Sequence, residues 1–445
     1  MFDGGGVVFI DGGALMNSRL NERWWLPDGV DELLPPDAFV LEKYRRLALD
    51  LFHSWGYELV FPPMMEYLDS LMSGSGEDLL HQTFKVTDPV SGRLLGVRAD
   101  ITPQVARIDA HRLRREGAQR YCYCGTVVRA NPENLLKDRS QVQIGAELFG
   151  SCALESDAEV MELLCVLLGR LPLTNITFVI GHAGLYRDLM NILQLGAEQQ
   201  AVLTQCLQHK SHPDLVDFLS TSSLNEASQG LVLAMSRFSG DVSVLAKAKV
   251  AFAEFPAMLK RVVEIEQVLF RLQQMHRNID FFIDLLDLRG YQYHTGIVFS
   301  AHTLVGDRVV DLAKGGRYDG VGEAFGRSRP ATGFSADLVQ WVAVTPLDTL
   351  PVSRAILAPC LNISDMTEAE KRLREKIATL RAAGETVIVA VDTGVTVDTG
   401  VTVDTGVAVE TIELSEPRLA AACDRQLTCN RQLVWQAGTW QVVGL

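Results

Sequence analysis

The chain has 445 residues, of which 47% are hydrophobic, and its formal net charge is -14 at pH 7. This length accommodates two or three domains, and the hydrophobic content suffices for a well-filled core. The acidic balance argues against a broad basic surface for nucleic acid, although a local basic groove can exist in an acidic protein. No apolar stretch reaches the length that spans a bilayer, and no basic-then-apolar leader is visible, so we expect a soluble, cytoplasmic protein without a membrane partner.

The chain opens with a glycine-rich stretch, and we leave residues 1–15 unassigned. From Asp37 to Trp55, apolar residues recur at three- and four-residue steps, which predicts a helix with Asp37 as its cap and Gly56 at its end. The next segment, 57–63, is strand-like and closes on proline. We therefore expect the first domain to begin with a helix, followed by a strand that ends at a proline.

Short strands joined by turns dominate the following part of the chain. A hairpin is expected from residues 84–88 and 93–98, which flank a turn that contains proline and glycine. Further strands are predicted at 119–129, 141–149 and 297–301, with a helix at 156–170 between them. These elements favour an α+β domain over residues 16–350, in which helices flank an antiparallel sheet. The stretch from about 185 to 275 lacks strand patterns and is predicted to be a helical insertion.

The remainder, 351–445, is predicted to be a small C-terminal α/β domain. A strand at 354–359, a helix at about 367–383 and a strand at 385–390 precede three copies of the unit VDTGVT, or a close variant, over 391–408. One aspartate and one glycine per unit are too sparse for a calcium-binding repeat, so extended padding is favoured.

Metal and nucleophile chemistry find little support in the sequence. Of the eight cysteines, Cys122 and Cys124 are spaced one residue too tightly for a zinc knuckle, so we expect reduced thiols and no metal. The glycine-rich stretches lack the following Lys-Ser/Thr that a nucleotide loop needs, and no cofactor is expected. His182 would serve as a base only beside a nucleophile or carboxylate, and because none is near in sequence a structural histidine is favoured.

The most informative segments are Arg289-Gly290-Tyr291-Gln292-Tyr293-His294 and Gly315-Gly316-Arg317-Tyr318-Asp319-Gly320. A zwitterionic amino acid needs an anion for its ammonium group, a cation for its carboxylate and, for histidine, a polar partner for the ring. Asp100, Arg289 and Glu147 supply these three types of group. Any one of them alone would be an ordinary ion pair or solvated charge, and the ordered set carries the inference.

These segments resemble the amino-acid pocket of class II histidyl-tRNA synthetases. The resemblance implies that Asp100 and Thr102 contact the α-amino group and that five further residues belong to the histidine pocket: Gln143, Glu147, Arg289, Tyr293 and Tyr318. His294 stands where the family has a second tyrosine. Arg129 matches the arginine that neutralises the α-phosphate of ATP.

Two departures affect the ATP site of that family. Asn131 replaces a glutamate that helps to bind ATP, and Gln340 replaces an arginine that clamps it. A neutral amide lacks the fixed charge and forked donors of a guanidinium, so no catalytic residue is assigned.

A chain that keeps the histidine contacts and loses ATP contacts resembles the regulatory-subunit family of ATP phosphoribosyltransferase, over roughly residues 16–350. The resemblance implies a non-catalytic subunit that joins a short catalytic subunit in the first step of L-histidine biosynthesis, with L-histidine as ligand and feedback inhibitor and no tRNA. It also implies homodimer contacts through the helix and strand of residues 37–63. Two alternatives stay open: an active histidyl-tRNA synthetase that uses ATP, magnesium and tRNA, and a stand-alone histidine sensor.

Overall fold

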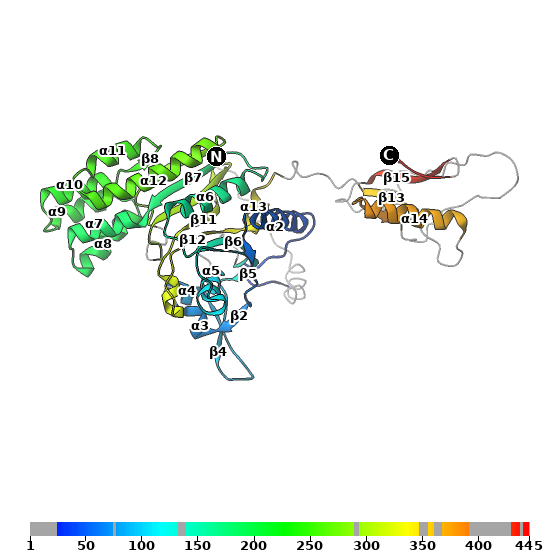
Figure 1. Ribbon diagram of the computed structural model, residues 1–445, viewed down its shortest axis with the longest axis horizontal. Helices are drawn as coiled ribbons and strands as arrows, with labels where there is room; N and C mark the ends of the chain where they lie inside the picture. Colours follow the sequence, from blue (N-terminus) through cyan, green and yellow to red (C-terminus); the bar gives the residue numbers. More distant parts are fainter. Residues whose placement is uncertain are drawn as a thin grey trace, which may run out of the picture. The chain divides into compact units, whose positions relative to one another are not determined.

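The structure, a computed structural model, describes eight stretches of the chain: 25–73, 77–131, 139–288, 293–346, 355–359, 367–390, 429–436 and 439–444. Its contacts divide the chain into two compact units, Met1–Pro346 and Leu347–Leu445 (Figure 1). The expected domain boundary at 350/351, the segment 1–15 and the repeat at 391–408 all lie outside the described residues.

The first unit begins with helix α2 (Asp37–Ser54), close to the expected bounds. The expected cap is wrong: Asp37 lies in the first turn, Pro36 occupies the cap position, and no side chain caps the helix. Gly56 follows the helix with a φ of 81°, as a helix-ending glycine does. The chain then forms β1 (Glu58–Leu59), which pairs in parallel with a later strand.

A small three-stranded sheet follows, in the order β2 (Met65–Tyr67), β4 (Leu94–Val97) and β3 (Phe84–Thr87). Two short helices accompany it, α3 (Leu68–Met72) and α4 (Glu77–Gln82). The antiparallel pairing of β3 with β4 confirms the predicted hairpin.

The core of the first unit is a nine-stranded sheet in the order β1-β5-β6-β12-β11-β10-β7-β9-β8. Its further strands are β5 (Gln119–Val128), β6 (Ser140–Phe149), β7 (Ile176–His182), β8 (Ser239–Gly240), β9 (Ile279–Asp284), β10 (Ile297–Val305), β11 (Arg308–Arg317) and β12 (Ala331–Asp337). From β5 to β7 all neighbours are antiparallel, as expected. The pairs β1–β5 and β7–β9 are parallel, because a long crossover separates the two strands of each pair.

Helices cover this sheet and complete its core. They include α5 (Thr102–Arg107), the π-helix η2 (Ile108–Leu113), α6 (Leu154–Leu168), the 3-10 helix η3 (Val321–Phe325) and α13 (Leu338–Val344). Tyr44 of α2 meets the fully buried Trp341 of α13 edge to face, with ring centroids 6.4 Å apart. Phe52 of α2 packs against Phe334 of β12 in the same manner. Aromatic packing therefore fastens both helices to the sheet.

The crossover from β7 to β9 contains the expected helical insertion, which Figure 1 shows gathered at one side of the sheet. Its helices are α7 (Ala183–Leu193), α8 (Ala197–Gln208), α9 (His212–Thr221), α10 (Glu226–Met235), α11 (Val244–Ala251) and α12 (Pro256–Met275). Helix α12 buries Val262, Ile265 and Leu269 at helical spacing and packs against α6, α7 and β7. Within the described residues, no helix is both long enough and apolar enough to cross a membrane.

The second unit is an α/β structure with a four-stranded sheet in the order β14-β13-β15-β16. Its elements are β13 (Ala355–Ala358), α14 (Glu368–Ala382), β14 (Val387–Val389), β15 (Cys429–Gln436) and β16 (Thr439–Gly444). Thr367 and Glu370 form a capping box at the start of α14, which fixes where that helix begins. The core includes Ile356, Leu373 and Leu433.

Candidate amino-acid pocket

A cavity of about 730 Å³ lies over the central strands of the first unit. Every predicted site residue that the structure describes lines it: Asp100, Thr102, Arg129, Gln143, Glu147, Tyr293, His294 and Tyr318. Arg289 lies outside the described residues. Residues separated by more than two hundred positions in sequence thus share one cavity.

Glu147 is the buried acidic group of the cavity. It lies on β6 with 1% of its surface exposed, and its carboxylate faces three hydroxyl groups. Thr102 donates to Oε1 at 3.0 Å and Tyr123 donates to the same oxygen at 3.1 Å, while Tyr318 donates to Oε2. The carboxylate needs Gly333 on the neighbouring strand β12, because a Cβ at that position would lie 1.6 Å from Oε2.

Burial raises the pKa of Glu147 to about 8, and the three hydroxyl groups offset this only in part. Desolvation disfavours the charged form, whereas the donated hydrogen bonds favour it, and here desolvation dominates. At neutral pH the empty pocket therefore holds a protonated carboxyl group. Such a group can donate one hydrogen bond and accept others, which suits a ring nitrogen of a ligand.

The second acidic group, Asp100, is held at the edge of the cavity. Its Oδ1 accepts hydrogen bonds from Gln143 Nε2 at 2.8 Å and from the Thr102 backbone at 3.1 Å. Gln143 is oriented in turn, because its Oε1 accepts the Ile101 backbone N–H at 2.9 Å. Gln143 and Glu147 lie four residues apart on β6 and so share one face of the strand.

Aromatic side chains form another part of the cavity wall. Tyr293 stacks on Tyr318 with ring centroids 5.1 Å apart, and His294 meets Tyr293 edge to face at 5.4 Å. Burial lowers the pKa of His294 to about 4, so its ring is neutral. The Tyr293 hydroxyl and His294 Nδ1 are buried without a hydrogen-bond partner in the structure. Unpaired buried polar atoms are unfavourable, and a polar ligand in the cavity would satisfy them.

The cavity also contains positions at which the resemblance implies contacts with the phosphates of ATP. Arg129 and Gln340 both line it, so the amide that replaces an arginine does face the cavity. The Asn131 side chain is bonded to the backbone: its nitrogen donates to the His81 carbonyl at 3.0 Å. Neither Asn131 nor Gln340 carries the charge of the residue that it replaces.

The structure adds cavity residues that sequence reasoning missed. Ser300 Oγ lies 2.8 Å from His302 Nε2, and His302 Nδ1 lies 3.0 Å from Asp311 Oδ1, all three along the cavity wall. The predicted strand 297–301 stopped before His302, although alternation along a longer strand would have placed it beside Ser300. Sequence reasoning also missed Tyr123, which does not line the cavity but donates a hydrogen bond to Glu147. In the described stretches, no cluster of three potential metal ligands occurs.

The chain matches the histidyl-tRNA synthetase family over residues 29–340. It is 43% identical over 370 residues to an ATP phosphoribosyltransferase regulatory subunit from Alkalilimnicola ehrlichii, which covers 83% of this chain and 90% of that one. It is 40% identical over 423 residues to the protein of that name from Pseudomonas fluorescens, covering 95% and 98%.

Solved structures share the fold. One from Bacillus halodurans, described as an ATP phosphoribosyltransferase regulatory subunit/histidyl-tRNA synthetase, has a TM-score of 0.72 at 24% identity and covers 84% of this chain and 94% of that chain. An ATP phosphoribosyl transferase complex from Thermotoga maritima has a TM-score of 0.52 at 18% identity, covering 69% and 98%. The identity to the curated relatives over most of both chains shows that this protein belongs to the ATP phosphoribosyltransferase regulatory subunit family, built on the class II histidyl-tRNA synthetase fold.

Proposed function

We propose that this chain is a regulatory subunit without catalytic activity of its own, which assembles with the short-form ATP phosphoribosyltransferase in the cytoplasm. It is required for the activity of that enzyme and for its inhibition by histidine in the first step of L-histidine biosynthesis. The observation that carries the proposal is one cavity in which the residues expected to hold histidine surround Glu147, while Gln340 lines it at the position where the synthetase family has an arginine. Asn131, which replaces a second charged group, is bonded to the His81 carbonyl.

L-Histidine is the proposed ligand of the pocket. Asp100 supplies an anion for the ammonium group, and the resemblance assigns the carboxylate to Arg289. Glu147 and the unpaired Tyr293 hydroxyl offer polar partners for the imidazole ring.

Lack of catalysis is tested by histidine-dependent exchange of pyrophosphate into ATP. Loss of a charged contact in the transition state costs several kcal/mol, so we expect no exchange above background. The positive control is the histidyl-tRNA synthetase of the same organism. Exchange at a rate typical of a synthetase would establish the alternative, an active histidyl-tRNA synthetase.

Assembly is tested by mixing the chain with the short catalytic subunit from the same organism. We expect one larger species in size-exclusion chromatography and a rise in transferase activity, because closed assemblies are usual for such subunits. Two proteins that elute separately and leave each other's activity unchanged would favour the stand-alone histidine sensor.

Histidine feedback through this pocket is tested on the reconstituted complex. Glu147→Gln and Arg289→Ala each alter a contact of the proposed ligand. A charge-assisted contact such as that of Arg289 is worth about 1.5 to 3 kcal/mol, so its loss should weaken inhibition roughly tenfold or more, whereas the protonated Glu147 makes a neutral contact worth about 0.5 to 1.5 kcal/mol, roughly two- to tenfold. Glu323→Gln, at an exposed position, is the matched control, and each variant must first be shown to assemble. Unchanged inhibition in both pocket variants would place the feedback site elsewhere.

The chain also exposes an apolar surface in the region expected to form homodimer contacts. Phe61 is 73% exposed, Leu59 is 45% exposed and Met64 is 44% exposed, so several exposed apolar side chains lie close together in this segment. We propose that this region pairs two copies of the chain. Sedimentation of Phe61→Asp should then show a shift toward monomer, whereas an unchanged dimer would exclude this surface.

A further inference from the structure

The segment 293–296 joins the pocket to two other parts of the molecule. It carries the pocket residues Tyr293 and His294, and it continues directly into β10. Thr295 fastens it to the end of β11: its hydroxyl donates to Asp319 Oδ2 at 2.7 Å and accepts the Asp319 backbone N–H at 3.1 Å. The Thr295 backbone N–H also donates to the Arg317 carbonyl at 2.6 Å.

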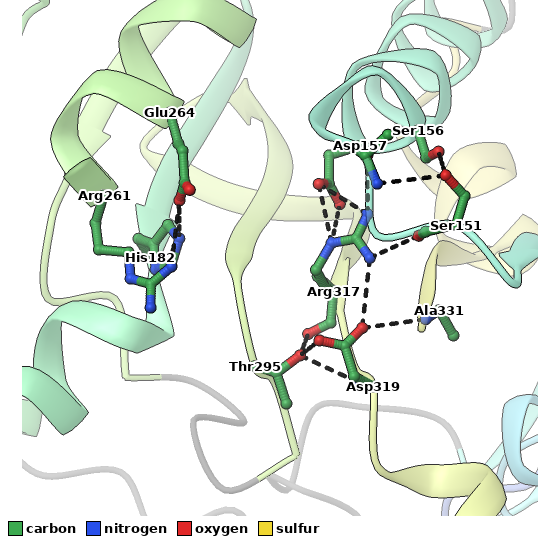
Figure 2. Close-up of polar contacts among 11 residues, drawn as sticks. Ser151, Ser156, Asp157, His182, Arg261, Glu264, Thr295, Arg317, Asp319 and Ala331 are labelled. Atoms are coloured by element: carbon green, nitrogen blue, oxygen red, sulfur yellow. Dashed lines mark hydrogen bonds and ion pairs between the residues drawn. The ribbon is translucent and has the colours of Figure 1, made fainter. Parts of the chain in front are cut away.

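The partner of Thr295 is itself fixed. Figure 2 shows Arg317 between Asp157 and Asp319, with its guanidinium directed at helix α6. Arg317 Nε lies 3.0 Å from each carboxylate oxygen of Asp157, and the two side chains are only 10% and 5% exposed. Asp319 Oδ1 lies 3.4 Å from Arg317 and accepts the Ala331 backbone N–H at 3.2 Å. Thr295 therefore binds to a carboxylate that also contacts Arg317 and the Ala331 backbone.

The same segment contacts the first helix of the insertion. Arg187 of α7 donates to the Thr295 carbonyl at 2.5 Å, and the Ala183 backbone N–H donates to the Gly296 carbonyl at 2.9 Å. The N-terminal part of α7 is thus bonded to the segment at two consecutive carbonyl groups.

Helix α7 is fixed to α12 by the second group in Figure 2. His182 caps α7, because its Nδ1 accepts the Gly184 backbone N–H at 2.9 Å. The ring proton therefore resides on Nε2, which donates to Glu264 Oε2 of α12 at 3.1 Å. Arg261 lies 3.5 Å from the same carboxylate. The start of α7 thus connects the pocket segment with the longest helix of the insertion.

We infer that Thr295 is a positioning residue that couples occupancy of the pocket to the start of α7. The inference rests on the proposed binding of L-histidine. A ligand held between Glu147 and the rings of Tyr293 and His294 restrains a segment whose next two carbonyl groups accept hydrogen bonds from α7. A contiguous hydrogen-bonded chain of this kind is a physical route for coupling, and the coupling acts equally in both directions.

The test compares Thr295→Val, which keeps the shape and removes the hydroxyl, with Thr295→Ser, which keeps the hydroxyl. Amide hydrogen exchange is measured for the peptide that covers 183–190, with and without L-histidine. In the wild type, histidine should slow exchange there. Thr295→Val should lose this protection and bind histidine more weakly, by about fivefold or more, because the coupling acts equally in both directions, whereas Thr295→Ser should retain both properties. A peptide from 197–208 serves as the internal control.

Two outcomes would overturn the inference. Equal histidine-dependent protection in the valine variant and the wild type would show that coupling does not depend on the Thr295 hydroxyl, and so that Thr295 is not the positioning residue. If the wild type does not bind histidine, the proposed ligand is wrong. The positioning role of Thr295 is then tested on the proteins without ligand, and it requires faster amide exchange at 183–190 in the valine variant than in the wild type and the serine variant. Identical exchange in all three would refute the positioning role itself.

Discussion

Because the carboxyl group of Glu147 is protonated in the folded protein, we predict that the free energy of unfolding falls as the pH rises. Burial raises the pKa of this group to about 8 in the folded protein, against about 4.3 in an unfolded chain. The folded state therefore binds a proton that the unfolded state has released between these values. The contribution of Glu147 to the free energy of unfolding is complete below pH 4. It decreases by about 1.4 kcal/mol per pH unit as the pH rises toward 8.

The variant Glu147→Gln replaces the protonated carboxyl group with an amide of similar shape that does not titrate. The stability of the wild type minus that of the variant should fall by about 4 kcal/mol between pH 5 and pH 8. Subtraction removes titrations that the two proteins share. The measurement is urea unfolding followed by tryptophan fluorescence at several pH values, with infrared difference spectra to detect the protonated carboxyl group. Parallel stability curves for the two proteins would refute the raised pKa.

Two further predictions concern packing around the pocket. Gly333→Ala should displace the Glu147 carboxylate, since its Cβ would lie 1.6 Å from Oε2, and should abolish histidine binding in calorimetry. Gly196→Ala, where the Cβ meets nothing within 4 Å, should bind normally, and a loss in both variants would contradict the steric argument. Arg329→Met should lower the free energy of unfolding by about 3 to 5 kcal/mol, because it leaves the buried Asp109 carboxylate, now 2.8 Å from Arg329, without its partner. Adding Asp109→Asn to that variant should restore much of the loss in urea unfolding, and no recovery would argue against an unpaired charge as its cause.

The sequence by itself determined the features that depend on local periodicity. Apolar spacing predicted α2 and the helical insertion, and turn residues predicted the hairpin of β3 and β4. It also brought the pocket residues of β6 to one face, because Gln143 and Glu147 are separated by an even number of residues on a strand. Ordered motifs then indicated the family, which the comparisons show.

Only the tertiary structure decided properties that depend on residues far apart in the chain. The carboxylate partner of His182 is Glu264, which lies 82 residues away on α12, so a search for a local partner could not find it. The raised pKa of Glu147 requires burial by residues from several elements of the fold, and a sequence does not report desolvation. The bond between Thr295 and Asp319 likewise exists because β10 and β11 pair and bring their ends together. Periodicity acts along the chain, whereas burial and partner choice arise from packing between elements, and packing decided the chemistry of this pocket.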